Sequence, residues 1–181
     1  PSSTMEATIT ILLKPGRDAA CCSNYRPLSL LNMDNKILAR VLAQKLKPLM
    51  SFLVLPEQAG FIPQHSMAFN LRSLTAVLHR VDPALPAVAA LLDAEKAFNS
   101  VEWPYMSLVL HCMGLGNYYF KCVNLLYAGS TARVHVNNAL SGPFEVQRGT
   151  RQGCPLSPLI FALAIEPLAS LFHEYHASRG L

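Results

Sequence analysis

A carboxylate that directly follows an apolar run is the residue of this sequence best suited to metal chemistry. Asp93 comes after the apolar segment 88–92, which predicts a strand buried on both faces with a carboxylate at its tip. A charge at such a place is costly unless a cation meets it, and a divalent metal ion does this well. A lone aspartate is also common as a helix cap or a surface residue, so the pattern leaves both interpretations open.

A second segment, 148–158, combines residues that suit phosphate chemistry. Gly149 and Gly153 allow another backbone to approach closely, and Arg148 and Arg151 can pair with phosphate. The segment also opens a predicted helix, whose amide end favours anions. The same pattern is typical of an ordinary loop that leads into a helix.

The third candidate is a basic stripe on a predicted helix over 34–49. Lys36, Arg40 and Lys47 fall on one side of a wheel with 3.6 residues per turn. The apolar residues fall on another side and predict the buried face; they are Ile37, Leu38, Val41, Leu42, Leu46 and Leu49. The stripe could follow a nucleic-acid backbone, or it could be a plain solvated helix face.

The elements that must position these residues alternate irregularly between strands and helices. Patterns of apolar residues predict strands over 7–13 and 25–31 and helices over 67–81, 104–113 and 118–128. The segments 132–136 and 143–148 flank a turn-forming Asn137-Asn138 pair and predict a hairpin. The segment 155–175 predicts a mostly helical end with a kink at Pro167.

Composition favours a folded chain with a weak preference for anionic partners. The sequence has 181 residues, of which 51% are hydrophobic and 14% charged, so wholesale disorder is not expected. The net charge of +4 suits a polyanion. Five cysteines without a C-x-x-C pair argue against a zinc site and a disulfide framework, and favour an intracellular setting. We expect no membrane span and see no targeting signal.

Motifs in a fixed order give this sequence a family resemblance. Together they resemble the reverse transcriptase domain of LINE-type (non-LTR) retrotransposons over nearly the whole chain, in the segments 11–16, 25–31, 57–63, 93–98 and 148–158. The resemblance implies an α+β fold, with right-hand polymerase fingers and an incomplete palm in which an antiparallel sheet packs with helices. It further implies that the fingers occupy about 1–87 and that fingers and palm share about 88–181.

The resemblance also implies roles for the residues around Asp93. Asp93 would be the catalytic, metal-binding carboxylate and the backbone carbonyl of Ala94 a second ligand of Mg²⁺. The backbone amides around Lys96 and Ala97 would face the triphosphate. Phe98 matches the steric gate, whose ring excludes the ribose 2′-hydroxyl, although a core phenylalanine is the plainer alternative.

Further roles follow for the nucleotide and the nucleic acid. Gln152 and Gly153 resemble the loop that lies against the nucleotide, and Arg26 is a candidate phosphate contact or a solvated arginine. The family implies an RNA template, a DNA primer and deoxynucleoside triphosphates as partners, with Arg148 and Arg151 joining the basic stripe as nucleic-acid contacts. It implies the nucleus and the cytoplasm as locations.

The sequence departs from the family at several points. Members carry a second carboxylate pair in an aromatic-x-Asp-Asp hairpin, and this chain has no Asp-Asp. Asn99 stands where an aspartate is usual, and Gln64-His65 replaces a Gly-Arg pair. We therefore expect a fragment of an RNA-directed DNA polymerase, truncated before that hairpin, that is inactive by itself and holds at most one metal ion weakly. The alternative is a catalytically dead retroelement remnant or a domesticated RNA- or DNA-binding module.

Overall fold

A mixed β-sheet forms one side of the molecule. The computed structural model describes residues 6–81 and 90–178, with only the backbone of 176–178. The sheet has the order β2-β1-β3-β4, with β5 also paired to β3; its strands are β1 (Glu6–Leu13), β2 (Tyr25–Leu30), β3 (Thr131–Val136), β4 (Ala139–Leu140) and β5 (Phe144–Glu145). Since β1 runs antiparallel to β2 but parallel to β3, the expectation of an antiparallel sheet was wrong. Parallel neighbours need a long crossover, and the helices between β2 and β3 supply it.

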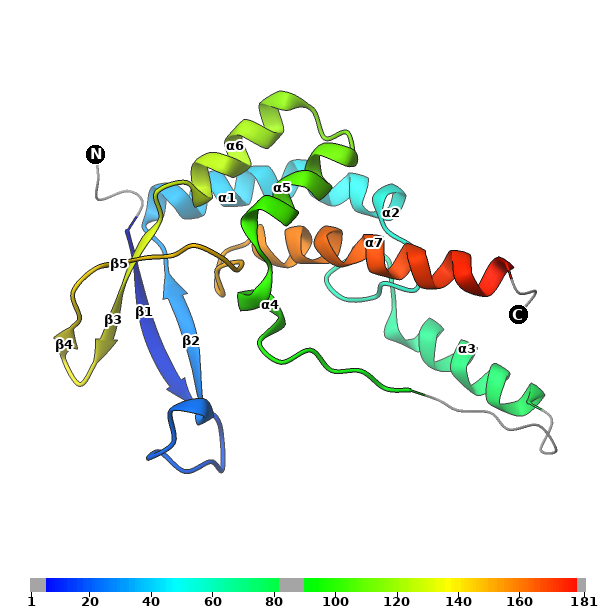
Figure 1. Cartoon of the computed structure of the whole chain (residues 1–181), viewed down its shortest axis with the longest axis horizontal. Helices are drawn as coiled ribbons and strands as arrows, with labels where there is room; N and C mark the ends of the chain where they lie inside the picture. The colour runs from blue at the N-terminus through cyan, green and yellow to red at the C-terminus, as the bar shows by residue number, and fades with distance from the viewer. Residues whose placement is uncertain (1–5, 82–89, 179–181) are drawn as a thin grey trace.

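Helices pack beside the sheet and extend away from it (Figure 1). They are η2 (Cys22–Asn24), α1 (Met33–Leu46), η3 (Lys47–Leu49), α2 (Met50–Leu53), α3 (Met67–Arg80), α4 (Ala97–Ser100), α5 (Trp103–Cys112), α6 (Asn117–Tyr127) and α7 (Ser157–Ser178). The predicted helices and the first two predicted strands are thus confirmed, and α7 continues helically through Pro167. No helix within the described residues is long and apolar enough to cross a membrane.

The hydrophobic core lies where α1, α5, α6 and the first half of α7 meet. Leu46, Met106, Leu110, Ile160 and Leu163 are among its fully buried side chains. By contrast, α3 has no buried residue and stands away from this core (Figure 1). The core therefore fixes the position of α7.

The buried face of α1 agrees with the predicted one only in part. Leu42 and Leu46 are buried as predicted, whereas Ile37 and Val41 are exposed and the small residues Ala39 and Ala43 are buried instead. Small residues let a neighbouring helix come close, and α6 packs there, with the Tyr119 hydroxyl donating to the Leu42 carbonyl at 3.1 Å. The packing of α6 thus decides which face of α1 is buried, although larger apolar side chains lie on the opposite face.

The strand predicted before Asp93 is not observed. Residues 88–89 lie outside the described residues, and 90–96 are irregular, with Leu91 and Leu92 exposed at 92% and 87%. A buried strand needs neighbours that satisfy its backbone N–H and C=O groups. None of the strands described here pairs with this segment. It runs extended below α7 and into α4 (Figure 1).

The predicted hairpin turn is confirmed, but the strand that follows it is β4 at 139–140, before the predicted segment 143–148, which contains β5. Asn137 and Asn138 adopt φ values of 50° and 60°, as a two-residue hairpin turn requires, and join β3 to β4. The chain then returns as β5, which pairs with the start of β3. This return leads directly into the segment 148–153.

Residues 148–153, here called the 148–153 turn, bind two distant segments through backbone hydrogen bonds. Gly149 N donates to Val101 O at 2.7 Å, and Thr150 N donates to Phe98 O at 2.7 Å. Ser29 N in β2 donates to Gln152 O at 3.0 Å. The 148–153 turn therefore links the α4 region to β2.

Both glycines of this turn lie against another backbone. A Cβ at Gly149 would lie 2.8 Å from the Cα of Asn99, and one at Gly153 would lie 2.9 Å from the carbonyl oxygen of Ser29. Their φ values of 85° and 99° are also unfavourable for any residue with a side chain. The link to α4 and β2 thus depends on glycine at both positions.

We predict that Gly149→Ala or Gly153→Ala lowers the free energy of unfolding by about 2–4 kcal/mol, because each adds backbone strain and a steric clash. Gly142→Ala is the matched control: nothing lies within 4 Å of its Cβ, and a change within about 0.5 kcal/mol is expected. Urea denaturation measures all three. Equal effects at the three positions would contradict the proposed packing of the turn.

Candidate functional site

Phe98 in α4 lies between two other phenylalanine rings. Its ring stacks on that of Phe161 in α7, with centroids 4.2 Å apart and planes 26° apart. Phe61 meets it edge-on, with centroids 6.1 Å apart and planes 84° apart. Both geometries are favourable for aromatic pairs. Phe98 is half-buried, so its ring is held in place but is not enclosed in the core.

The turn before Phe98 has an unusual backbone. Lys96 adopts the left-handed conformation with φ 52°, and its carbonyl accepts from Asn99 N at 2.8 Å and from the Ser100 hydroxyl at 3.1 Å. Lys96 itself is exposed, and its ammonium lies 3.8 Å from the exposed carboxylate of Glu95. The turn therefore leads from the extended segment into α4, which begins with Ala97 and Phe98.

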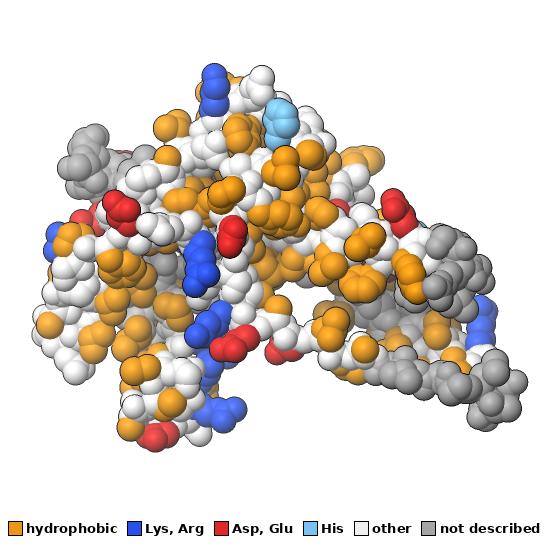
Figure 2. Space-filling view, viewed as in Figure 1, with side chains coloured by type: hydrophobic (Ala, Val, Ile, Leu, Met, Phe, Trp, Pro, Cys, Tyr) orange, Lys and Arg blue, Asp and Glu red, His pale blue; other side chains and the backbone are white. Residues whose placement is uncertain are grey.

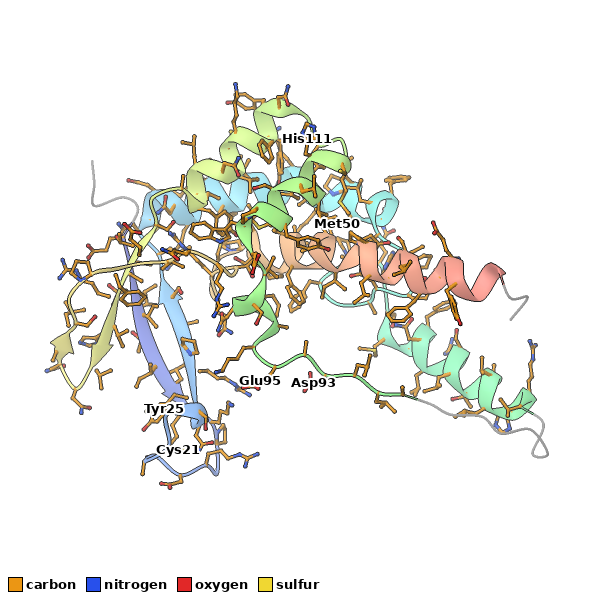
Figure 3. The ribbon with its side chains drawn as sticks, in the orientation of Figure 1. Cys21, Tyr25, Met50, Asp93, Glu95 and His111 are labelled. Carbon is orange, nitrogen blue, oxygen red and sulfur yellow. The ribbon has the colours of Figure 1, made fainter. Side chains whose placement is uncertain are left out.

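Asp93 is exposed on the extended segment before α4. Figure 3 shows Asp93 and Glu95 on this segment, below the helical body. Within residues 6–81 and 90–178, no three His, Cys, Asp or Glu side chains cluster as a metal site would require. One carboxylate with a backbone carbonyl does not fit the ligand set of two divalent ions, which need carboxylates on both sides. Asp93 is thus available to a metal ion but insufficient for a complete site.

Arg151 lies inside the protein, unlike Arg148, which is exposed. Arg151 is 9% exposed and donates a hydrogen bond to the hydroxyl of Ser130, a buried residue between α6 and β3. Burial lowers the pKa of the Arg151 guanidinium, and burial raises the pKa of the neighbouring Tyr127 hydroxyl. Arg151 therefore ties the 148–153 turn to the end of α6, and its predicted contact with phosphate stays a prediction.

A cavity of about 720 Å³ opens between the sheet and the 148–153 turn. Its lining includes Ser29 of β2, Glu102 before α5, and Arg148, Arg151 and Gln152 of the turn. Gln152 and Arg148 therefore line a common space with Ile9 of β1 and Ser29 of β2. Trp103 fixes the adjoining backbone, because its indole N–H donates to Gly149 O at 3.0 Å.

The remaining predicted residues are spread over two elements. Arg26 is exposed on β2, three residues before Ser29, which bonds to the turn. Arg40 and Lys47 are exposed and Lys36 is half-buried, on α1 and η3, which are not among the segments that the backbone hydrogen bonds to Phe98, Val101 and Ser29 join to the turn. Figure 2 shows Lys and Arg side chains gathered between the β1–β2 hairpin and the segment leading into α4. The structure thus joins Phe98, Gln152 and the strand of Arg26, but not the basic stripe.

Sequence reasoning missed the neighbours of Phe98. Phe61 and Phe161 were not predicted as site residues, although Phe61 lies in a motif segment and Phe161 follows another. A single aromatic residue in a loop or an apolar helix carries no sign of its partner. Only the fold brings positions 61, 98 and 161 together.

Comparison with known proteins agrees with this arrangement of motifs. The family described as reverse transcriptase (RNA-dependent DNA polymerase) matches residues 12–179. Among curated relatives, the "Transposon TX1 uncharacterized 149 kDa protein" of Xenopus laevis is 33% identical over 175 residues, which cover 96% of this chain and 13% of that protein.

Two Drosophila polymerases are also similar. The "Probable RNA-directed DNA polymerase from transposon BS" of Drosophila melanogaster is 28% identical over all of this chain and 20% of its own length. The "RNA-directed DNA polymerase from mobile element jockey" of Drosophila funebris is 27% identical over 90% of this chain and 18% of its own length. The chain thus spans a fifth or less of these three relatives. It belongs to the reverse transcriptase family and is related to polymerases of non-LTR retrotransposons.

Proposed function

We propose that this chain is the fingers and part of the palm of an RNA-directed DNA polymerase of a LINE-type retroelement. In the full-length protein, these parts would hold a deoxynucleotide against an RNA template during addition to a DNA primer. The fingers would span about 1–87, and the remaining residues would complete the fingers and begin the palm. The match of residues 12–179 to the reverse transcriptase family supports the reaction class.

The observation that carries the proposal is the backbone link made by the 148–153 turn. Its bonds to Phe98 O and to Ser29 N bring three segments together that are far apart in the sequence. Templated synthesis needs a group that senses the sugar, a group near the base pair and cations near the phosphates. The ring of Phe98 is suited to sensing the sugar, and the amide of Gln152 to a place near the base pair. The guanidinium of Arg26 is suited to the phosphates.

Each residue would act through a specific contact with the nucleotide. The ring of Phe98 would occupy the space that a ribose 2′-hydroxyl needs, and the amide of Gln152 would hydrogen-bond near the base. Gly153 would leave room for the nucleotide. The exposed guanidinium of Arg26 and the backbone amides at Lys96 and Ala97 would meet its phosphates.

The metal requirement of the family is only partly met by this chain. We propose that Asp93 and the carbonyl of Ala94 supply ligands to Mg²⁺. Further carboxylates are needed beside them to hold the ion, because within residues 6–81 and 90–178 no three His, Cys, Asp or Glu side chains cluster. We therefore expect this chain alone not to polymerise. An inactive remnant, or a module that only binds nucleic acid, is the competing function, and it predicts no selection between sugars.

We predict that the chain binds dATP with Mg²⁺ more tightly than ATP with Mg²⁺, and that Phe98→Val removes this preference. The expected loss is about tenfold or more, because the smaller side chain leaves space for the 2′-hydroxyl. Saturation-transfer NMR suits the weak binding expected here. Phe52→Val, on α2 and 86% exposed, is the control that should keep the preference. Equal binding of the two nucleotides by the wild-type chain would refute the nucleotide site.

We also predict that single-stranded RNA binds with an affinity that falls as salt rises, since phosphate contacts release counterions. If the basic stripe contacts RNA, Arg40→Gln should reduce the slope of log affinity against log salt by about 0.7, the value for one phosphate contact. Lys45→Gln is the matched control on the same helix, because position 45 lies on the side of α1 opposite the stripe. Filter binding measures both variants. Equal slopes for both would show that the stripe is a solvated face.

A further inference from the structure

Phe61 has a backbone conformation that its side chain disfavours. Its φ of 64° lies in the left-handed region, where a bulky residue is strained. Its ring is 62% exposed, so burial in the core does not explain the conformation. What the conformation does provide is the edge-on contact with Phe98, at 6.1 Å between centroids. Strain of this kind persists only where the surrounding structure imposes it.

The loop 54–66, which carries Phe61, is fastened to α7 by one buried carboxylate. Glu166 is 6% exposed and accepts hydrogen bonds from Leu55 N at 3.1 Å, from the Ser170 hydroxyl at 3.1 Å and from the side-chain amide of Gln58. The same Gln58 amide donates to Ala162 O at 3.2 Å. The first half of the loop therefore has its position set by α7.

The second half of the loop is held to the first. The Nδ1 of His65 pairs with Gln58 O at 2.7 Å, and His65 N donates to Ile62 O at 3.3 Å. Ile62, beside Phe61, is buried in the core. Phe61 thus lies between anchored residues on both sides, which explains how its strained conformation is maintained.

The helix α7 places both rings that contact Phe98. Phe161 lies on α7 itself, and Glu166, five residues later on the same helix, fixes the loop that presents Phe61. One face of the Phe98 ring is therefore covered by Phe161, while Phe61 is placed at a right angle to that ring. A ring held by both contacts cannot tilt freely. A steric gate can discriminate between ribose and deoxyribose only while its ring stays in place.

We propose that Phe61 is a positioning residue for sugar selection, which acts by fixing the ring of Phe98. This inference rests on the proposed function, because it assumes that Phe98 meets the nucleotide sugar. Phe61 itself need not touch the nucleotide. Loss of the Phe61 ring should let the Phe98 ring move and make room for the ribose 2′-hydroxyl. The binding of ATP should therefore improve, whereas the binding of dATP, which has no 2′-hydroxyl, should stay unchanged.

The test compares variants of the 181-residue chain by saturation-transfer NMR with dATP or ATP, each with Mg²⁺. We expect Phe61→Leu to lower the preference for dATP by about 2- to 12-fold, the range that one aromatic pair contributes. Phe61→Tyr keeps the ring and should restore the preference. Phe69→Leu on α3, at 56% exposure, is the matched control and should have no effect. Global destabilisation would instead weaken the binding of both nucleotides.

A second variant tests the anchor of the loop without touching a ring. Glu166→Gln replaces an accepting oxygen with an amide that faces the Gln58 amide, so one of the loop's bonds to α7 is lost. We expect a smaller fall in preference in the same direction. If Phe98→Val abolishes the preference for dATP but neither Phe61→Leu nor Glu166→Gln changes it, the proposed role of Phe61 is wrong. The steric-gate role of Phe98 is then still supported. If the wild-type chain shows no preference, the gate and this inference fail together.

Discussion

The arrangement of the candidate site depends on the backbone hydrogen bonds of the 148–153 turn. Unpaired N–H and C=O groups are costly inside a protein, and this turn satisfies its own by bonding to Phe98, Val101 and Ser29. The bonds are possible because Gly149 and Gly153 let the backbones come together. Arg151 adds a side-chain tie to Ser130. The proposed contacts with a nucleotide lie in three places. They lie on this turn, on the segments that it binds, or on the extended segment that leads into α4.

The second determinant of the site is α7, which begins four residues after the turn ends. Its first half is core, with Ile160 and Leu163 fully buried, so its outward side is fixed with respect to the sheet and the other helices. That side presents Phe161 to Phe98 and Glu166 to the loop 54–66. A helix whose stability comes from the core can thus hold a ring and a carboxylate in fixed positions at the site. Precision at the site is obtained from packing at a distance from it.

The sequence predicted most of the helices and strands but fewer of the contacts between them. The strand β1 and the helices α3, α5 and α6 were foreseen from their periodicity, since apolar spacing is a local property. The buried face of α1, the parallel pairing of β1 with β3 and the irregular segment at Leu91 depend on neighbours, which a local pattern does not specify. The motifs identified Asp93, Phe98 and Gln152 as candidates. They gave no sign that Phe61 and Phe161 contact Phe98, because a contact between distant residues exists only in the fold.

Hydrogen exchange at single amides tests the central claim most directly, because the claim is that three segments form one cooperative unit. The amides of Ser29, Gly149 and Thr150 each donate to another segment of that unit. If the turn holds β2 and α4 together, these amides should exchange at similar rates and with a free energy of opening close to that of Leu163 in the core. Should Ser29 and Thr150 exchange as quickly as the exposed amide of Gly142, the turn does not hold the site together and the account is wrong.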